Sequence, residues 1–166
     1  LDFDSDAENL KHSLIDFLGD KDYVLIDAAA GVGDEVEAAV EASDEVLLVS
    51  KPELPSLTNA LGAKKLAEQM ERDVIGLVLN EVRNEDHEVE HEDIKDLVGE
   101  QILSKVPDHR HVREAIALRD PVVSYKPDSR ASHKIEDVAY QIRGEEPPKR
   151  GLSTQLKYKV DEFNLL

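Results

Sequence analysis

The segment Asp22–Glu53 contains an alternation of element types that restricts the fold of the whole chain. Tyr23–Asp27 begins with a short apolar run of strand-forming residues, which is too short for a helix. A helix-length stretch follows at Asp34–Ala42, and a second apolar run of the strand type follows at Glu45–Ser50. Strand, tight turn, helix and strand in this order predict a βαβ unit with parallel strands.

A carboxylate and two glycines stand at the end of the first predicted strand, where open parallel sheets bind their ligands. Asp27 ends the apolar run, and Gly31 and Gly33 follow it closely. A carboxylate at this place could hold the water shell of a nucleotide's Mg²⁺, and glycines let the backbone approach a phosphate. By pattern alone, an Asp that ends a strand is often only a helix cap or part of a surface turn.

The rest of the chain continues the alternation, which predicts one α/β domain with a mainly parallel sheet. The strand at Asp73–Asn80 is almost continuously apolar, which predicts a sheet covered on both faces. Pro121–Val123 is predicted to start an extended piece. A further strand is predicted at Gln101–Val106. Helices are predicted at Ala7–Leu18, at Ser56–Met70, near the end of the segment Glu81–Asp96, at Arg110–Leu118 and from Ser129 to Gly144. The last of these helices carries an apolar stripe of Ala131, Ile135, Val138, Ala139 and Ile142.

Composition limits the function further. The chain has 37 acidic and 20 basic residues and a net charge of −17, to which residues 1–100 contribute −19 and residues 101–166 contribute +2. Such a surface repels nucleic acid, so direct nucleic-acid binding is not expected. No apolar run is long enough to span a membrane and cysteine is absent, which favours a cytoplasmic protein. His87 and His91 lie in an acidic segment for which a solvated loop is favoured over a metal site.

The segment around Asp27 resembles the Asp-x-Pro-x-Gly region of the MinD/ParA ATPases, a branch of the P-loop NTPases. Asp27 matches the family's Mg-associated aspartate, and Gly31 matches its switch glycine. Lys51–Glu53 looks like the residues that close the next strand. Ala29 departs from the pattern, because the family usually has proline there. The resemblance implies a three-layer P-loop NTPase-like fold, in which Asp27 is the catalytic residue and holds Mg²⁺ through water.

The resemblance extends over about Lys21–Arg143. Asn80 looks like the family's strand-ending asparagine, which offers the adenine edge a donor and an acceptor side by side. Pro107 and Asp108 look like the loop that lies against the base. The resemblance therefore implies ATP and Mg²⁺ as cofactors, and its nucleotide-binding residues are Gly31, Asn80, Pro107 and Asp108.

One part of the family pattern is not in the sequence. The Lys-Gly-Gly-x-Gly-Lys-Thr loop, whose amides and lysines hold the phosphates, does not occur. Asp2–Leu10 superficially resembles a switch segment but lies too close to Asp27. We therefore expect residues 1–144 to be the C-terminal part of such an ATPase domain, with its N-terminal strands missing. We expect the chain alone to have no ATPase activity. In this class of protein, the phosphate-loop strand lies between the strands that correspond to Tyr23–Asp27 and Glu45–Ser50. Without it, these two strands either leave an empty slot or close directly on each other.

Residues 151–166 are predicted to form an amphipathic tail after a linker at 145–150. Four apolar residues share one helical face of the tail, namely Leu152, Leu156, Val160 and Phe163. MinD-type proteins carry such a helix, which sits on membranes, so the resemblance implies a weak peripheral contact with the inner face of the cell membrane. Packing against the domain and disorder are equal alternatives.

For the complete protein, the resemblance implies a homodimer when ATP is bound and slow ATP hydrolysis. These steps would switch the binding of an unknown protein partner or of the membrane, in spatial organisation such as the placement of the cell division site. The alternative is a non-catalytic acidic protein-interaction domain that keeps the fold without the nucleotide.

Overall fold

The computed structural model describes residue 19 and residues 21–163, with side chains as far as residue 158. The predicted helix at Ala7–Leu18 and the switch-like segment Asp2–Leu10 lie outside these residues. The chain divides into two compact units. The first unit comprises residues 1–77 and 89–101, and the second comprises residues 78–88 and 102–166.

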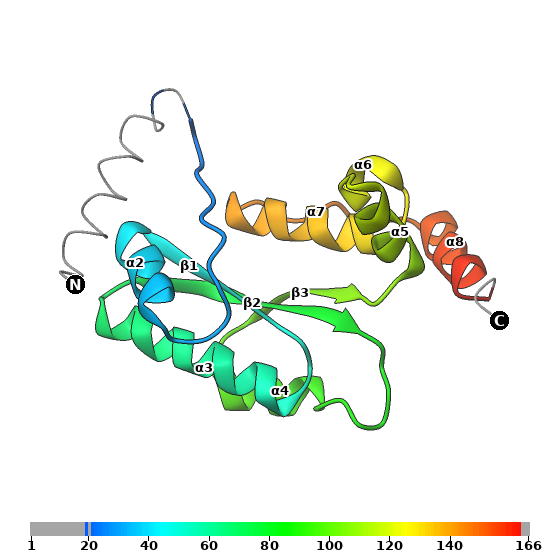
Figure 1. The fold of residues 1–166 in the computed structure, drawn as a ribbon. Helices are drawn as coiled ribbons and strands as arrows, with labels where there is room; N and C mark the ends of the chain where they lie inside the picture. Colours follow the sequence, from blue (N-terminus) through cyan, green and yellow to red (C-terminus); the bar gives the residue numbers. More distant parts are fainter. Residues whose placement is uncertain (1–18, 20, 164–166) are drawn as a thin grey trace. The chain divides into compact units, whose positions relative to one another are not determined.

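Three parallel strands form one sheet in the order β1-β2-β3 (Figure 1). They are β1 (Glu45–Ser50), β2 (Asp73–Val82) and β3 (Ile102–Pro107), close to the predicted bounds. Residues 76–79 of β2 are consecutively buried, which confirms that this strand is covered on both faces. Among the described residues, β1 has β2 as its only strand neighbour. No strand of the described chain therefore fills the slot expected beside β1.

The first unit packs two helices around an apolar core. The helices are α2 (Asp34–Ala42), at the predicted bounds, and α3 (Leu54–Gln69), which begins two residues before the prediction because proline is favoured in a first turn. The core consists of Val36, Val40 and Ala67, with Val46, Leu66, Met70 and Val74 packed against it.

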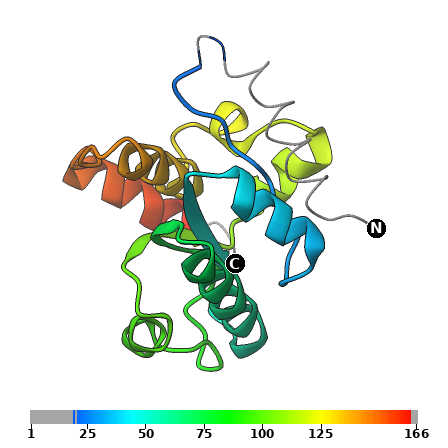
Figure 2. The same ribbon diagram turned by 90° about the vertical axis from the view of Figure 1, so that its left-hand side faces the viewer.

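The helix α4 (His91–Val98) lies beside α3 (Figures 1 and 2). Lys64 of α3 donates to the carbonyl of Val98 at 2.8 Å and pairs with Glu100 at 2.9 Å. A cation on the last carbonyls of α4 is favourable because the C-terminal end of a helix is negative. Gly99 then ends α4 in the left-handed conformation, with φ of 71°.

The second unit contains α5 (Arg110–Leu118), α6 (Val122–Tyr125), α7 (Arg130–Ile142) and α8 (Leu152–Phe163). The helix α7 packs on β3, and α6 contacts both α5 and α7. Ser129 caps α7 by accepting a hydrogen bond from the Ser132 amide at 3.1 Å, which confirms the predicted helix start. The bounds of α5 also agree with the prediction.

The prediction of a strand at Tyr23–Asp27 is wrong, because this segment has no regular structure. It runs as an irregular stretch before α2 (Figure 1), and Leu25 is 81% exposed. A strand needs a neighbour that pairs with its backbone amides and carbonyls. No described strand supplies one, so the apolar run has the composition of a strand without its hydrogen bonds.

Two predictions for the second unit also need correction. Val122–Tyr125 is a helical turn, not an extended piece, because the amides of Ser124 and Tyr125 both donate to the carbonyl of Pro121 at 2.9 Å. The predicted apolar stripe of α7 is only partly buried, since Ala131 is buried but Ile135 and Ala139 are exposed. The polar residues Ser132 and Asp137 are buried there instead, because hydrogen bonds satisfy them.

Candidate functional site

The structure brings three of the predicted site residues together in the second unit. Asn80 lies near the carboxyl end of β2, and Pro107 ends β3. The amide of Asp108 donates to the carbonyl of Val82 at 3.0 Å, which joins the ends of the two strands. The carboxyl edge of a parallel sheet is where such folds bind ligands, so the three residues form a coherent candidate site.

The side chain of Asn80 is available to a ligand. The residue is half-buried, and its amide has no hydrogen-bond partner among the described residues. A carboxamide presents one donor and one acceptor side by side, which matches the pattern on the edge of an adenine ring. Its position therefore fits the role predicted from the sequence.

The carboxylate of Asp108 is held by two arginines. Arg83 Nε donates to Asp108 Oδ2 at 2.8 Å, and Arg113 Nη1 binds Asp108 Oδ1. The hydrogen bond to Asp108 is the main reason that the pKa of Arg83 is raised. Asp108 therefore orders the loop after β3, and its carboxylate is already engaged. No pattern in the sequence predicts this role of the two arginines.

The segment after β2 is ordered by a further carboxylate. Glu88 accepts hydrogen bonds from the amides of Arg83 and Asn84 at 2.8 and 2.7 Å. Asn84 has a positive φ of 58°, a conformation that asparagine adopts more readily than most residues. These contacts fix the backbone that leaves the candidate site.

Asp27 and Gly31 belong to the first unit. The carboxylate of Asp27 is exposed and has no ion pair among the described residues, so it can meet a hydrated cation. Gly31 has φ of +113°, which only glycine adopts without strain. A Cβ placed at Gly31 or Gly33 would meet no atom within 4 Å, so this backbone faces open space.

The start of α2 is poorly suited to holding phosphates. Gly33 is its N-cap, and its first turn carries the three acidic residues Asp34, Glu35 and Glu37. Amides at a helix start attract anions, but carboxylates there already occupy that favourable potential. Gly31 and Gly33 therefore do not replace the phosphate loop.

His87, in the acidic segment, lies at the surface beside a carboxylate. His87 Nε2 lies 3.3 Å from a carboxylate oxygen of Glu85, and both side chains are exposed. In the part of the chain that the structure describes, no group of three or more potential ligands could hold a metal ion. A membrane-spanning helix is also not found among the described residues.

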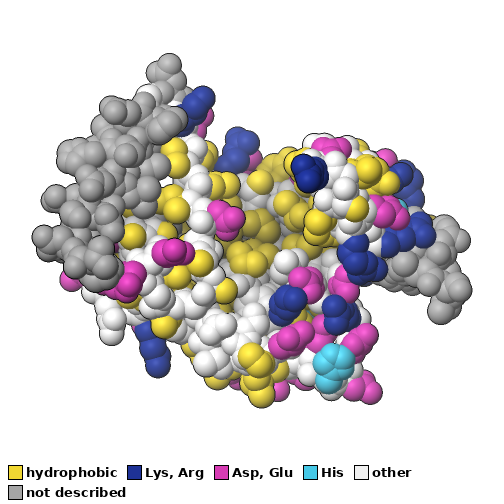
Figure 3. All heavy atoms as spheres, viewed as in Figure 1, with side chains coloured by type: hydrophobic (Ala, Val, Ile, Leu, Met, Phe, Trp, Pro, Cys, Tyr) yellow, Lys and Arg dark blue, Asp and Glu magenta, His cyan; other side chains and the backbone are white. Residues whose placement is uncertain are grey.

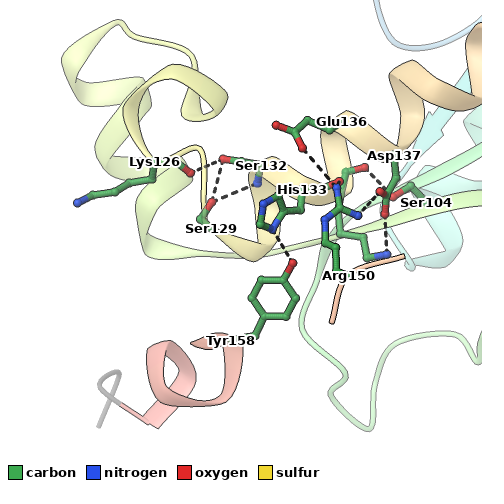
Figure 4. Close-up of polar contacts among 10 residues, drawn as sticks. Ser104, Lys126, Ser129, Ser132, His133, Glu136, Asp137, Arg150 and Tyr158 are labelled. Atoms are coloured by element: carbon green, nitrogen blue, oxygen red, sulfur yellow. Dashed lines mark hydrogen bonds and ion pairs between the residues drawn. The ribbon is translucent and has the colours of Figure 1, made fainter. Parts of the chain in front are cut away.

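An ion pair that no sequence pattern predicts fixes the linker before α8 (Figure 4). Asp137 is 5% exposed and accepts a hydrogen bond from Lys134 Nζ at 2.9 Å. Arg150 binds the same carboxylate and also donates to the carbonyl of His133 at 3.0 Å. Asp137 lies outside the predicted apolar stripe of α7, so helical periodicity gave no signal of this pair.

A second contact joins α8 to α7 directly. The Tyr158 hydroxyl is hydrogen-bonded to His133 Nδ1, and the two rings meet edge to face at 5.8 Å (Figure 4). Leu152 and Leu156 of the same helix remain 79% and 62% exposed. Residues 152–163 of the tail are helical, and the described contacts between α8 and α7 are polar.

Comparisons with known proteins agree with this architecture. A model of the family described as 4Fe-4S iron sulfur cluster binding proteins, NifH/frxC family, matches residues 7–161. The chain has no cysteine, the usual ligand of such clusters, so these residues offer no cysteine thiolate to one. The match therefore indicates the family and not a cluster in this chain.

Individual relatives are ATP-binding and cell division proteins. An uncharacterized ATP-binding protein of Methanocaldococcus jannaschii is 31% identical over 152 residues, which are 92% of this chain and 53% of that protein. The septum site-determining protein MinD of Thermotoga maritima is 32% identical over 135 residues, which are 76% of this chain and 49% of that protein. The chain thus spans about half the length of the curated relatives that it matches.

A solved structure supports the fold. The cell division ATPase MinD of Pyrococcus furiosus superposes with a TM-score of 0.76 at 25% identity, over 83% of this chain and 58% of that chain. The fold class and the family resemblance predicted from the sequence are therefore confirmed. By its family match, its relatives and its parallel α/β fold, the chain belongs to the NifH, MinD and ParA type of P-loop ATPases.

Proposed function

We propose that this chain is the adenine-binding and magnesium-binding portion of a MinD-type ATPase. In the longer protein, ATP and Mg²⁺ would drive dimerisation, and slow hydrolysis would reverse it. This cycle would switch the binding of a protein partner or of the membrane during spatial organisation such as division-site placement. The observation that carries the proposal is the convergence of Asn80 and Pro107 at one sheet edge, joined by the hydrogen bond from Asp108 to Val82.

Each predicted residue has a role in this proposal that fits its surroundings. The free amide of Asn80 would bind the adenine edge, and Pro107 with the backbone of Asp108 would lie against the base. Asp27, an exposed carboxylate, would hold the water shell of Mg²⁺, and Gly31 would let the switch segment change conformation. Bound Mg²⁺ neutralises the negative charge that develops on phosphate oxygens.

The adenine role can be tested on the chain itself by nuclear magnetic resonance. Adenosine is expected to shift the backbone amides around Asn80 and Pro107. Replacing Asn80 by alanine removes a donor and an acceptor, so Asn80→Ala should weaken adenosine binding about tenfold. The matched control is Asn59→Ala on the exposed face of α3, which should bind adenosine like the unmodified chain.

Guanosine provides the test of base selectivity. Its ring edge carries an oxygen acceptor where adenine has an amino donor, so it should bind more weakly than adenosine. Equal effects of the two nucleosides, or shifts confined to other parts of the chain, would contradict an adenine site. That outcome would favour an acidic protein-interaction domain that does not bind nucleotide.

We also propose that the tail carries any membrane affinity of the chain. Leu152 and Leu156 are exposed, and burial of apolar side chains contributes roughly 25 cal/mol per Å². The rest of the chain is acidic and is repelled by anionic lipid. One short helix binds lipid weakly, so two joined tails should bind more strongly because the second attaches at high effective concentration.

Sedimentation with anionic vesicles checks the membrane prediction. Three samples are compared, namely the chain, a version ending at Gly144, and residues 151–166 fused to a dimeric coiled coil. The first should sediment weakly, the second should stay in solution, and the dimerised tail should sediment strongly. A dimerised tail that stays in the supernatant would identify α8 as a docked or partner-binding helix instead.

A further inference from the structure

The irregular segment before α2 approaches α3 closely at a glycine. Gly62 lies in the middle of α3, and a Cβ placed on it would lie 2.6 Å from Cγ1 of Val32. Carbon atoms in contact need about 3.5–4.0 Å, so only glycine leaves room for Val32 here. We propose that Val32 and Gly62 form a latch that holds the turn with Asp27 and Gly31 on α3. Both are then positioning residues for the magnesium-facing carboxylate, a role that rests on the proposed function of Asp27.

A glycine in this place is unfavourable for the helix, and the latch explains it. Gly62 is the only glycine inside a helix that the structure describes. Glycine is the least favourable residue in a helix interior after proline, because it loses the most backbone freedom on folding. Close approach of another group is a physical reason for glycine at such a position, and Val32 supplies that group.

The contact continues the interface between α2 and α3. Val36 and Val40 follow Val32 at steps of four residues and belong to the apolar core of the first unit. Leu66, four residues after Gly62, packs against the same core. Residues four apart lie on one side of a helix, so Val32 prolongs this apolar row beyond the start of α2.

The first turns of α2 offer Val32 no apolar partner at the usual place. Gly33 is the N-cap of α2, and an apolar residue before the cap often packs against the fourth residue of the helix. In α2 that residue is Glu37, an exposed carboxylate. The contact with Gly62 is therefore left to set the direction in which the chain enters α2.

The latch is weak enough to open. Residues 23–32 make no hydrogen bond or ion pair with the residues that the structure describes. Yellow apolar side chains remain at the surface along this segment in Figure 3, and Val32 itself is 59% exposed. Gly31, directly before it, has φ of +113°, a backbone conformation that glycine can enter and leave without strain. The turn can therefore leave α3 at small cost.

The position of Val32 decides where the turn lies. Val32 follows the turn that begins at Asp27, so its docking on α3 fixes one end of that turn. A displaced Val32 takes Gly31 with it, because no hydrogen bond to a described residue holds the turn elsewhere. A misplacement of about 1 Å at a reacting group can cost about 100-fold in rate. The latch therefore acts on hydrolysis, whereas the adenine residues belong to the second unit.

Cysteine cross-linking tests the latch directly, because the chain has no cysteine of its own. A disulfide needs Cβ atoms about 3.5–4.5 Å apart, and the close approach of Val32 Cγ1 to position 62 meets this need. Under mild oxidation, Val32→Cys with Gly62→Cys should form an intramolecular disulfide at least about tenfold faster than Val32→Cys with Glu68→Cys, as mass spectrometry measures. Glu68 is exposed on another side of α3, about 9 Å further along the helix. Equal rates for the two pairs would overturn the latch.

A double-mutant cycle separates the latch from general damage. Gly62→Ala inserts a methyl group where Val32 lies, so it should shift the amide signal of Gly31 in nuclear magnetic resonance spectra. In the Val32→Ala background the same substitution should shift that signal at least about threefold less, because the methyl group that it meets is then absent. The control Glu68→Ala should leave the signal in place. Equal shifts in both backgrounds, or no shift, would contradict a contact between the two residues.

The positioning role is measured on hydrolysis, after the missing first half is supplied from the Methanocaldococcus jannaschii relative. In that chimera, Gly62→Ala should lower kcat about ten- to hundredfold and change Mg-ATP binding less than about twofold. Val32→Ala should also lower kcat, and the double variant should lower it no further, because both act through one contact.

The outcomes keep the latch apart from the function on which it rests. Unchanged kcat in Gly62→Ala, together with reduced kcat in Asp27→Asn, would overturn the positioning role. Unchanged kcat in both variants would overturn the proposed role of Asp27 and the positioning role with it. Cross-linking then still decides whether Val32 docks on Gly62, because it needs no nucleotide.

Discussion

Mg-ATP is expected to bind the 166-residue chain no more tightly than adenosine does. The adenine residues Asn80 and Pro107 are present, but the sequence has no Gly-rich phosphate loop, and the start of α2 carries three acidic residues. The triphosphate therefore finds no group in this chain that compensates its charge, and it adds nothing to the binding free energy. Isothermal calorimetry with Mg-ATP and with adenosine measures the comparison directly.

The contribution of the missing loop can be measured by supplying it. A chimera with the corresponding first half of the Methanocaldococcus jannaschii relative should bind Mg-ATP at least about 1000-fold more tightly, because two hydrogen bonds from charged groups suffice for that factor. In the same chimera, Asp27→Asn should reduce hydrolysis more than binding, since a Mg²⁺ water shell matters most when charge develops in the transition state. Sub-micromolar binding of Mg-ATP by the chain alone would contradict its assignment as a portion without the phosphate grip.

The second large effect is expected on stability. Asp137→Asn should lower the free energy of unfolding by about 2–4 kcal/mol, because it leaves Arg150 and Lys134 without their shared buried carboxylate. Urea denaturation followed by circular dichroism measures the change. The matched control is Glu136→Gln on the same helix. Its half-exposed carboxylate meets Arg150 at 3.3 Å, so it should cost less than about 1 kcal/mol.

The same carboxylate predicts a dependence on pH. Burial of Asp137 acts to raise its pKa, but hydrogen bonds from Lys134 and Arg150 outweigh burial, and the pKa is lowered. Its contribution to stability is therefore complete above the pKa of the unfolded chain, at about 3.9, and is lost as the pH falls towards the lower folded value. Between about pH 4 and pH 2 the unmodified chain should lose more stability than Asp137→Asn does. Equal slopes would show that Asp137 is not held as a charged partner.

A double-mutant cycle separates the ion pair from general damage to α7. Arg150→Ala alone leaves Asp137 buried with Lys134 only, and the double variant Asp137→Asn with Arg150→Ala removes both partners. The double variant should be more stable than the sum of the two single effects predicts, because neither charge is then left uncompensated. Additive effects would mean that Arg150 does not depend on Asp137 for its position.

The sequence by itself determined the class of fold and most of its elements. The bounds of α2, β1 and α5 agree with the prediction because apolar periodicity and the neighbouring glycine, proline and polar residues mark them locally. The same order of elements carried the family resemblance, which the comparisons confirm. It also placed Asn80 and Pro107 at strand ends, so that parallel pairing alone brings them to one edge.

Only the tertiary structure decided which local preferences are realised. The apolar run at Tyr23–Asp27 is irregular because strand formation depends on a partner from elsewhere in a sheet, which no local pattern can supply. Val122–Tyr125 is helical although three of its residues favour strands. The Ser132 hydroxyl lies within hydrogen-bond distance of the carbonyls of Val122 and Lys126, at the two ends of the turn, and can donate to either.

Long-range polar contacts were likewise beyond the sequence. Arg150 reaches Asp137 across 13 residues, and Arg83 reaches Asp108 across 25. Charges at such separations carry no periodic signal, since their pairing depends on how helices and strands pack and not on their spacing along the chain. The sequence therefore determined most of the elements and the family, and packing decided the charge pairs.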